Sequence, residues 1–242
     1  MDEVQLHDAF AAATPGDVGL EPHAVHVWAV PLSGDSDRCT ALLSADEIAK
    51  GERFRFVDHR RRFLIGRAAV RTILAGYLGA DPAALEFDVG ARGKPRLVRA
   101  GAPEFNLSHS AQLALVAVGG APLGVDVEKV RHLERLCDIA QRQFSTAEYA
   151  ALEALPERER LPAFYRCWTR KEAYVKALGL GLSALDVFDV ALGERAALLA
   201  LRDGQQVAEW SLGDVSPGPD YTAAVAVKDP HASVRQFRFG DL

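Results

Sequence analysis

Apolar and polar positions alternate with different periods along the chain, and each period predicts a strand or a helix. The apolar run AVHVWAV (24–30) is rich in β-branched and aromatic residues and predicts a buried strand. A helix is predicted from about Ser44, because Glu47 stands three residues later, the spacing of a capping box. A second helix is predicted over about 58–78, because Gly79 and then an Asp-Pro pair follow it.

Beyond this helix, short apolar runs separated by Gly and Pro predict strands, and a new set of helices follows. Because the order starts again, the pattern predicts an α+β fold built from two similar subdomains, at 1–120 and 121–242. Residues 1–22 are polar and punctuated by Pro and Gly, and they are predicted to be loosely ordered. The remaining predicted elements are strands at 85–90, in FNLSHS, on both sides of 119–124, and at 186–192, 205–212 and 221–228, and helices at 133–143, 146–154 and 162–178.

The composition is that of an ordinary soluble globular protein, with 49% hydrophobic and 25% charged residues. The net charge of −5 argues against a nucleic-acid-binding protein, whose affinity depends on a clearly basic face. No apolar run is long enough to span a membrane, and the acidic N-terminus lacks the order of a signal peptide. The three cysteines, Cys39, Cys137 and Cys167, are widely spaced, which argues against a zinc site or disulfide framework and for a cytoplasmic protein.

Two acids lie two residues apart in the segment GVDVEKV. In an extended strand, the carboxylates of Asp126 and Glu128 face the same side, and Val125 and Val127 face the core. Neighbouring carboxylates repel each other unless a cation or a proton lies between them. The spacing alone leaves two interpretations open, a solvated edge strand with two outward acids or a cation site.

A third acid lies in the predicted helix 162–178, in which Pro162 suits the first turn. Glu172 flanks the apolar stripe of this helix, and Lys176 lies one turn further along the same edge. Taken alone, these two residues are an ordinary surface ion pair. Lys171 falls near the middle of the stripe, where an unpaired buried charge is costly, so it must reach solvent or meet an anion.

Taken together, Asp126, Glu128 and Glu172 could supply hard oxygen ligands to a divalent cation. Mg²⁺ takes few protein ligands and completes its shell with water and phosphate oxygens, and Mn²⁺ remains an alternative. Neighbouring lysines would then neutralise a diphosphate. Such a set serves phosphoryl transfer, in which catalysis is mostly positioning and charge stabilisation.

At these residues the chain resembles the Sfp-type 4'-phosphopantetheinyl transferases. GVDVE (124–128) matches the family segment G-[IV]-D-[IV]-E, and WTRKEAYVK (168–176) matches W-x-x-K-E-[AS]-x-x-K. GKP (93–95) and FNLSHS (105–110) agree as well, and the similarity covers roughly residues 43–190. The resemblance implies a pseudo-dimer of two α+β halves, monomeric in solution, with coenzyme A in the cleft between the halves.

The resemblance also implies roles for single residues. Asp126, Glu128 and Glu172 would hold the Mg²⁺ that bridges the coenzyme A diphosphate, and Lys176 would contact the same diphosphate. One departure matters, because Glu47 stands where Sfp, after which the family is named, carries a basic residue, and Arg53 or Arg62 would have to substitute. The residues assigned to the rest of coenzyme A are Lys50 and Arg62 at its phosphate pocket, the loop Arg92, Gly93 and Lys94 beside the adenosine, and Asn106, Ser108 and His109, of which the last two would bind the 3'-phosphate.

The implied reaction is attack of a carrier-protein serine on the β-phosphorus of coenzyme A, with adenosine 3',5'-bisphosphate leaving. Asp126, Glu172 and Lys176 are the catalytic candidates, and Glu172 or Glu128 would deprotonate the serine of the acyl or peptidyl carrier protein. A metal-dependent nucleotide phosphodiesterase is an alternative, but it would need a second metal or a histidine cluster to activate water. A non-catalytic module that binds coenzyme A or a carrier is another, and it would be expected to lack one of the three catalytic candidates, all of which are present.

Overall fold

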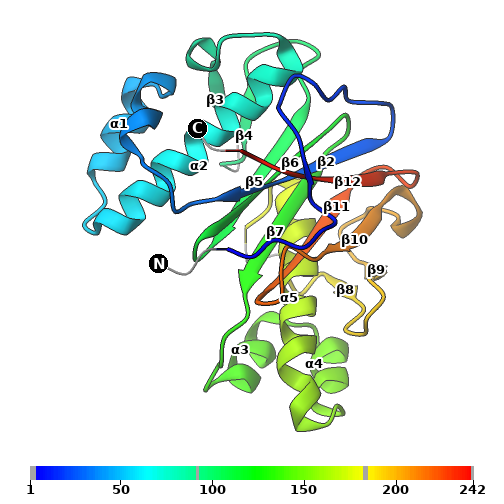
Figure 1. Ribbon diagram of the computed structural model, residues 1–242. Coiled ribbons are helices and arrows are strands. Elements are labelled where there is room, and N and C mark those ends of the chain that lie inside the picture. The colour runs from blue at the N-terminus through cyan, green and yellow to red at the C-terminus, as the bar shows by residue number, and fades with distance from the viewer. Residues whose placement is uncertain (1–3, 91–92, 182–184, 241–242) are drawn as a thin grey trace.

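The computed structural model describes residues 4–90, 93–181 and 185–240, and its elements follow the same order in each half of the chain (Figure 1). Each half contains a strand, short helices, one long helix, two short paired strands and two further strands. The first half comprises β2 (Ala24–Pro31), η1 (Asp37–Leu42), α1 (Ala45–Glu52), α2 (Val57–Leu78), η2 (Pro82–Ala84), β3 (Phe87–Val89), β4 (Pro95–Leu97), β5 (Glu104–Ser110) and β6 (Leu113–Gly119). The second comprises β7 (Leu123–Lys129), α3 (Leu136–Gln143), α4 (Thr146–Glu153), α5 (Glu157–Leu178), β8 (Phe188–Val190), β9 (Leu198–Leu201), η4 (Val207–Glu209), β10 (Ser211–Val215) and β11 (Tyr221–Val227). Two strands stand outside this repeat, β1 (Ala11–Ala12) and β12 (Ser233–Arg238).

The two halves also pair their strands in the same way, which confirms the predicted α+β fold of two similar parts. The strand order is β2-β6-β5 in the larger sheet and β7-β11-β10 in the smaller one. In the first half, β2 pairs with β6 and β6 with β5. In the second half, β7 pairs with β11 and β11 with β10, and all four pairs are antiparallel. The larger sheet continues beyond β2 through parallel pairing with β12 and then β1.

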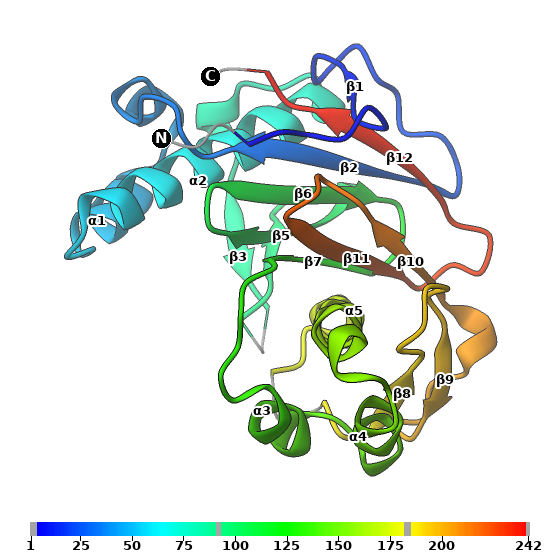
Figure 2. The same ribbon diagram turned by 60° about the horizontal axis from the view of Figure 1, so that its bottom comes forward.

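The two sheets lie face to face between the long helices, as Figure 2 shows with α5 viewed almost along its axis. Alternate residues of a strand face opposite ways. On β2, Val25 and Val27 therefore pack between the sheets, and Trp28 packs towards α2. A third hydrophobic cluster lies between the smaller sheet and α5. Because β6 is buried on both faces, its sequence is apolar without interruption.

The helix boundaries confirm most of the predicted signals. Ser44 caps α1 and forms the capping box with Glu47, and Gly79 ends α2 in the left-handed conformation at φ 57°. The predicted start of α5 at Pro162 is wrong, because the helix begins five residues earlier at Glu157. Acidic residues in its first turn stabilise this earlier start, since they complement the positive end of the helix dipole.

Other segments also differ from the prediction, and strands β4 and β9 are among the elements that the sequence does not predict. The predicted strand at 205–212 is wrong, because Val207–Glu209 form η4 and β10 starts only at Ser211. Strand β12 is not predicted, because Phe237 is its only buried residue and the sequence shows no apolar alternation. The predicted loose order of residues 1–22 stays a prediction, and the structure adds that Phe10 is buried in the cluster between the sheets.

The predicted division at residue 120 stays a prediction. The structure adds that β12, from the C-terminal part, pairs with β2 of the N-terminal part. Among the described helices, none has the length and apolar character needed to cross a membrane.

Candidate active site

The packing of α5 on β7 brings the two candidate motifs together. Gly124 leaves room for this contact, because a Cβ atom there would overlap the carbonyl oxygen of Ala173 and lie 2.9 Å from the carbonyl carbon of Lys176. Glycine therefore lets the helix backbone rest directly on the strand. Two residues further along β7, Asp126 bonds to Lys176 and lies close enough to Glu172 for their charges to interact.

Lys94 reinforces the same contact from the N-terminal half. Its ammonium group donates to the carbonyl oxygens of Leu123, on β7, and Ala177, on α5, at 2.9 and 3.3 Å. Burial lowers the pKa of this lysine, and the nearby carboxylate of Glu104 opposes the shift. The structure thus places Lys94 at the junction of the halves. Its predicted neighbour Arg92 lies outside the described residues, and Gly93 has a φ of 87°, which favours glycine.

Polar side chains of β5 cover the free edge of β7. Asn106, Ser108 and Ser110 stand at alternate positions and point the same way. They accept hydrogen bonds from backbone N–H groups of β7 that have no strand partner on that side, which joins the two sheets through side chains. The three bonds run from Val125 N to Asn106 Oδ1 (2.9 Å), from Val127 N to Ser108 Oγ (3.4 Å) and from Lys129 N to Ser110 Oγ (3.0 Å).

Asp126 and Glu172 are buried in this junction, and Glu128 is half-buried. Asp126 is 3% exposed, and its Oδ1 accepts from Ser108 Oγ at 2.8 Å and from Lys176 Nζ at 2.6 Å. Glu128 accepts from Ser110 at 2.7 Å, and Glu172 is 8% exposed. The interpretation of a solvated edge strand with outward acids is therefore wrong for Asp126, because α5 covers that face of β7.

Burial perturbs the acids of this group. It raises the pKa of Glu172 from 4.5 to about 7, the negative charges of Asp126 and Glu128 add to the shift, and Lys176 opposes it. Burial also raises the pKa of Glu128, although a hydrogen bond from Ser110 works against this. The buried carboxylates of Asp126 and Glu172 lie close together, and such a pair favours a bound proton or a bound cation.

The donor set fits a cation, but the described residues do not form a finished metal site. Within 4–90, 93–181 and 185–240, no three His, Cys, Asp or Glu side chains are close enough together to hold a metal ion. Instead, the ammonium of Lys176 neutralises Asp126. Two buried oxygens, Asp126 Oδ2 and Glu172 Oε1, have no hydrogen-bond partner in the described part of the chain, and such hard oxygen atoms suit Mg²⁺.

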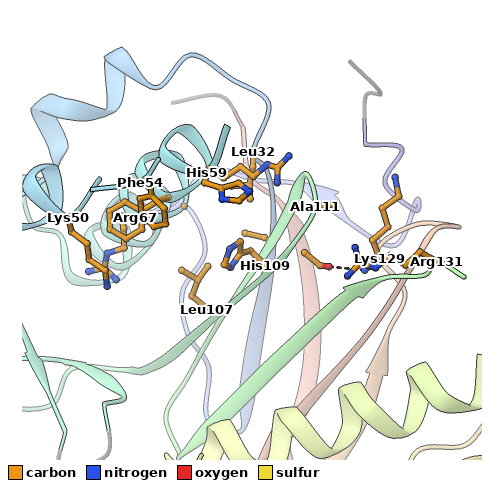
Figure 3. Close-up of a pocket in the computed structure, with 15 residues that line it drawn as sticks. Leu32, Lys50, Phe54, His59, Arg67, Leu107, His109, Ala111, Lys129 and Arg131 are labelled. Atoms are coloured by element: carbon orange, nitrogen blue, oxygen red, sulfur yellow. Dashed lines mark hydrogen bonds between the residues drawn. The ribbon is translucent and has the colours of Figure 1, made fainter. Parts of the chain in front are cut away.

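A cavity of about 710 Å³ lies on the other side of β5, between this strand and the segment from α1 to α2. Figure 3 shows Lys50, Phe54 and Arg67 on one side of it, with His109 facing them from β5. The charged side chains that line it are all cations among the described residues, and two histidines accompany them. These lining residues are Lys50, Arg62, Arg67, Lys129, Arg131, His59 and His109.

The structure separates two neighbours that the sequence assigns to one phosphate. His109 lines the cavity, where burial and the charges of Lys176 and Arg62 lower its pKa. Ser108 points to the opposite side of β5 and bonds to Asp126 and Lys176. Consecutive strand residues face opposite ways, so the two side chains lie on opposite sides of β5.

Comparison with known proteins agrees with this geometry. The descriptions "4'-phosphopantetheinyl transferase, N-terminal" and "4'-phosphopantetheinyl transferase superfamily" match residues 27–120 and 122–226. The 4'-phosphopantetheinyl transferase HetI of Nostoc sp. is 41% identical over 223 residues, which are 88% of this chain and 91% of that protein. This chain belongs to the 4'-phosphopantetheinyl transferase superfamily. Also similar are a 4'-phosphopantetheinyl transferase of Bacillus subtilis (35% identity; 82% of this chain, 93% of the other) and Sfp of Bacillus subtilis (31%; 83% and 89%).

In this transferase the lysine next to Glu172 meets an anion, which is one of the two outcomes that the sequence left open. Lys171 is 1% exposed, and its ammonium donates to both carboxylate oxygens of Glu148 at 2.9 and 2.7 Å and to the carbonyl of Phe188 at 2.8 Å. Glu148 is also the acceptor of the capping box of α4, with Ser145 as N-cap. The pair fixes the part of α5 that carries Glu172 against α4 and β8.

Several cavity residues of the transferase are not among the sequence candidates. Lys129 is the last residue of β7, and Arg131 lies two residues beyond it. The sequence alone does not show where β7 ends, so it could not place these two side chains at the cavity. His59 and Arg67 lie on α2, and no sequence pattern marks the face of this helix that borders a cavity. The predicted residues Lys50 and Arg62 do line it.

Proposed function

We propose that this transferase moves the phosphopantetheine group of coenzyme A to a serine hydroxyl of an apo carrier protein, acyl or peptidyl, and releases adenosine 3',5'-bisphosphate. Family membership supports the type of reaction. The observation that carries the assignment of the site is the group of buried carboxylates beside Lys176, next to a cavity lined by cations.

The two places suit the two charged parts of coenzyme A. The diphosphate fits beside Asp126, Glu172 and Lys176, on the α5 side of β5. The 3'-phosphate fits the cationic cavity on the α2 side of the same strand. The two places are adjacent, because Ser108, which bonds to Asp126 and Lys176, and His109, which lines the cavity, are consecutive residues of β5. One molecule with phosphates at both positions could therefore occupy both.

We assign a divalent cation, Mg²⁺ by preference, to Asp126, Glu128 and Glu172. The partnerless buried oxygens of Asp126 and Glu172 support this assignment. When bound, the cation would neutralise the diphosphate oxygens and supply Lewis-acid stabilisation as their charge grows. Lys176 would then leave Asp126 for the diphosphate, since its side chain is 29% exposed and able to move.

The chain's own residues do the rest of the chemistry. The carrier serine forms a bond from its Oγ to the β-phosphorus, the bond from that phosphorus to the leaving bisphosphate breaks, and the hydroxyl proton passes to a carboxylate. Glu172 is our choice of base, because its buried Oε1 has no hydrogen-bond partner in the described part of the chain and is therefore open to accept a proton. Lys176 stabilises the negative charge that develops on the diphosphate oxygens as the bisphosphate leaves.

Exposed cations border the site and suit an acidic carrier. Arg53, Arg55 and Arg60 are exposed around the segment that joins α1 to α2, beside the exposed rings of Phe54 and Phe56. Opposite surface charges steer two proteins together and weaken with salt. We therefore place the carrier next to this segment, where its serine could reach the diphosphate.

The test is incubation of the purified chain with coenzyme A, Mg²⁺ and a panel of apo acyl and peptidyl carrier proteins, followed by intact-mass spectrometry. We expect a carrier to gain the mass of one phosphopantetheine group, and both EDTA and Asp126→Asn to abolish the gain. Glu157→Gln, an exposed acid at the start of the same helix as Glu172, is the control and should keep full activity.

Two outcomes would point to the alternative functions. Hydrolysis of coenzyme A at the same rate with and without a carrier would identify a nucleotide phosphodiesterase. Tight binding of coenzyme A without any transfer, in the presence of Mg²⁺ and every carrier tested, would identify a non-catalytic binding module.

A further inference from the structure

We propose that Arg67 is a ligand of the 3'-phosphate of coenzyme A. Glu47 would by itself neutralise Arg67, and we propose that Arg71 cancels the charge of Glu47 and so leaves Arg67 positive. The inference rests on the proposed function, because it names a specificity residue for the same donor. Arg67 lies on α2, lines the cationic cavity and has a side chain that is 16% exposed (Figure 3).

The direction of the Arg67 guanidinium is fixed from two sides. Its Nε donates to Glu47 Oε1 at 2.7 Å, and its Nη2 contacts the same oxygen. The guanidinium carbon also lies 5.0 Å from the centre of the Phe87 ring, within cation–π range. A guanidinium held in place loses little freedom when it binds an anion, and its planar fork matches a phosphate. Glu47 is the only carboxylate recorded against Arg67 in the described part of the chain.

The charge of Glu47 is shared with a second arginine. Arg71 is 2% exposed, its Nε donates to Glu47 Oε2 at 2.7 Å, and its Nη1 donates to the carbonyls of Pro82 and Leu85. Arg71 does not line the cavity, so it cannot serve a ligand there. Two guanidinium groups and one carboxylate leave a net charge of +1. This remaining charge falls to Arg67, the member of the trio on the cavity wall.

This arrangement accounts for an acid at position 47. Both oxygens of the Glu47 carboxylate are already engaged, because they accept hydrogen bonds from the two arginines and from the backbone N–H of Ser44. Burial opposes ionisation of this carboxyl, but the hydrogen bond from the Ser44 backbone and the two arginines outweigh it and lower the pKa. Glu47 therefore stays ionised and acts as a clamp for Arg67. A phosphate monoester carries close to two negative charges at neutral pH, more than one lysine neutralises.

The experiment measures binding of coenzyme A and dephospho-coenzyme A by calorimetry with the full chain. We expect Arg67→Met to weaken coenzyme A binding about tenfold or more, the usual effect of losing a charge-assisted hydrogen bond in a partly buried site. Binding of dephospho-coenzyme A should stay within about twofold, since this ligand lacks the group that Arg67 contacts. The matched control is Arg142→Met, an exposed arginine of α3 that does not line the cavity, and it should leave both affinities unchanged.

A second variant keeps the test decisive if Arg67→Met folds poorly. The double variant Glu47→Gln/Arg67→Met removes both charges, so no ionised carboxylate is left facing Arg71 alone, and it should show the same selective loss for coenzyme A. The inference fails if the variants lower both affinities equally, or neither, while wild type transfers phosphopantetheine normally. It also fails if wild type binds the two donors equally. If wild type neither binds coenzyme A nor transfers its group, the proposed function itself fails.

Discussion

Glu172 makes the stability of this transferase depend on pH in a direction opposite to that of most paired carboxylates. Burial and two neighbouring acids raise its pKa from 4.5 to about 7 in the folded chain. Below pH 4.5 both states carry the proton. Between pH 4.5 and 7 the folded state keeps a proton that the unfolded state has lost, so the free energy of unfolding falls as the pH rises. Above pH 7 the loss is complete and constant.

The size of this effect follows from the same values. One pH unit corresponds to about 1.4 kcal/mol, so the shift from 4.5 to about 7 costs roughly 3 kcal/mol of stability at neutral and higher pH. Glu172→Gln has no charge to lose. We expect the free energy of unfolding of wild type, relative to that of the variant, to fall by about 2–3 kcal/mol between pH 5 and pH 8.

The assay is urea unfolding followed by circular dichroism in EDTA, at several pH values from 5 to 8, for wild type and Glu172→Gln. The difference between the two proteins removes the contributions of other titrating groups. Glu157→Gln, at the exposed start of the same helix, should follow wild type at every pH. A difference between wild type and Glu172→Gln that stays flat, or grows in favour of wild type as the pH rises, would refute the assignment. Added Mg²⁺ should stabilise wild type more at pH 8 than at pH 5, because the cation binds the ionised carboxyl.

Three further outcomes are expected. Gly124→Ala should lower the free energy of unfolding by about 2 kcal/mol or more and abolish transfer, because the new methyl group overlaps α5. The control Gly120→Ala should do neither, because its methyl group meets no atom within 4 Å. Thermal melting and intact-mass spectrometry measure the two effects. Lys171→Met should cost about 3–5 kcal/mol in urea unfolding, because it leaves Glu148 buried and unpaired, and adding Glu148→Gln should restore part of the loss; an equal cost in the double variant would contradict this account. In steady-state kinetics, higher ionic strength should raise the KM for the carrier more than the KM for coenzyme A, and a flat carrier KM would indicate an apolar interface instead.

Much of the local structure could be predicted because its signals lie within a few residues. The capping box of Ser44 and Glu47 and the left-handed Gly79 each act over a single turn, and the structure confirms both. The alternation in β7 likewise predicted that Val125 and Val127 would face the core and Asp126 the other side. Local signals fail where burial is slight, as in β12, or where a helix starts among charged residues, as α5 does at Glu157.

The candidate site shows the same division between local and long-range information. Its residue types, Asp126, Glu128, Glu172 and Lys176, could be named from two short motifs, because carboxylates and lysines in that spacing suit a metal and a diphosphate. The sequence could not show that Lys176 neutralises Asp126, because that bond needs α5 to lie directly on β7.

The sequence by itself determined most of the helices and the more buried strands, the repeat of their order and the chemistry of the two motifs, since each depends on neighbours along the chain. Tertiary structure alone decided which side chains meet. It set Ser108 against Asp126 and turned His109 into the cavity, and it joined Glu47 to Arg67 and Arg71, 20 and 24 residues away. The physical reason is that periodicity sets which face of an element is apolar, whereas the partners of buried polar groups depend on how closely distant elements pack.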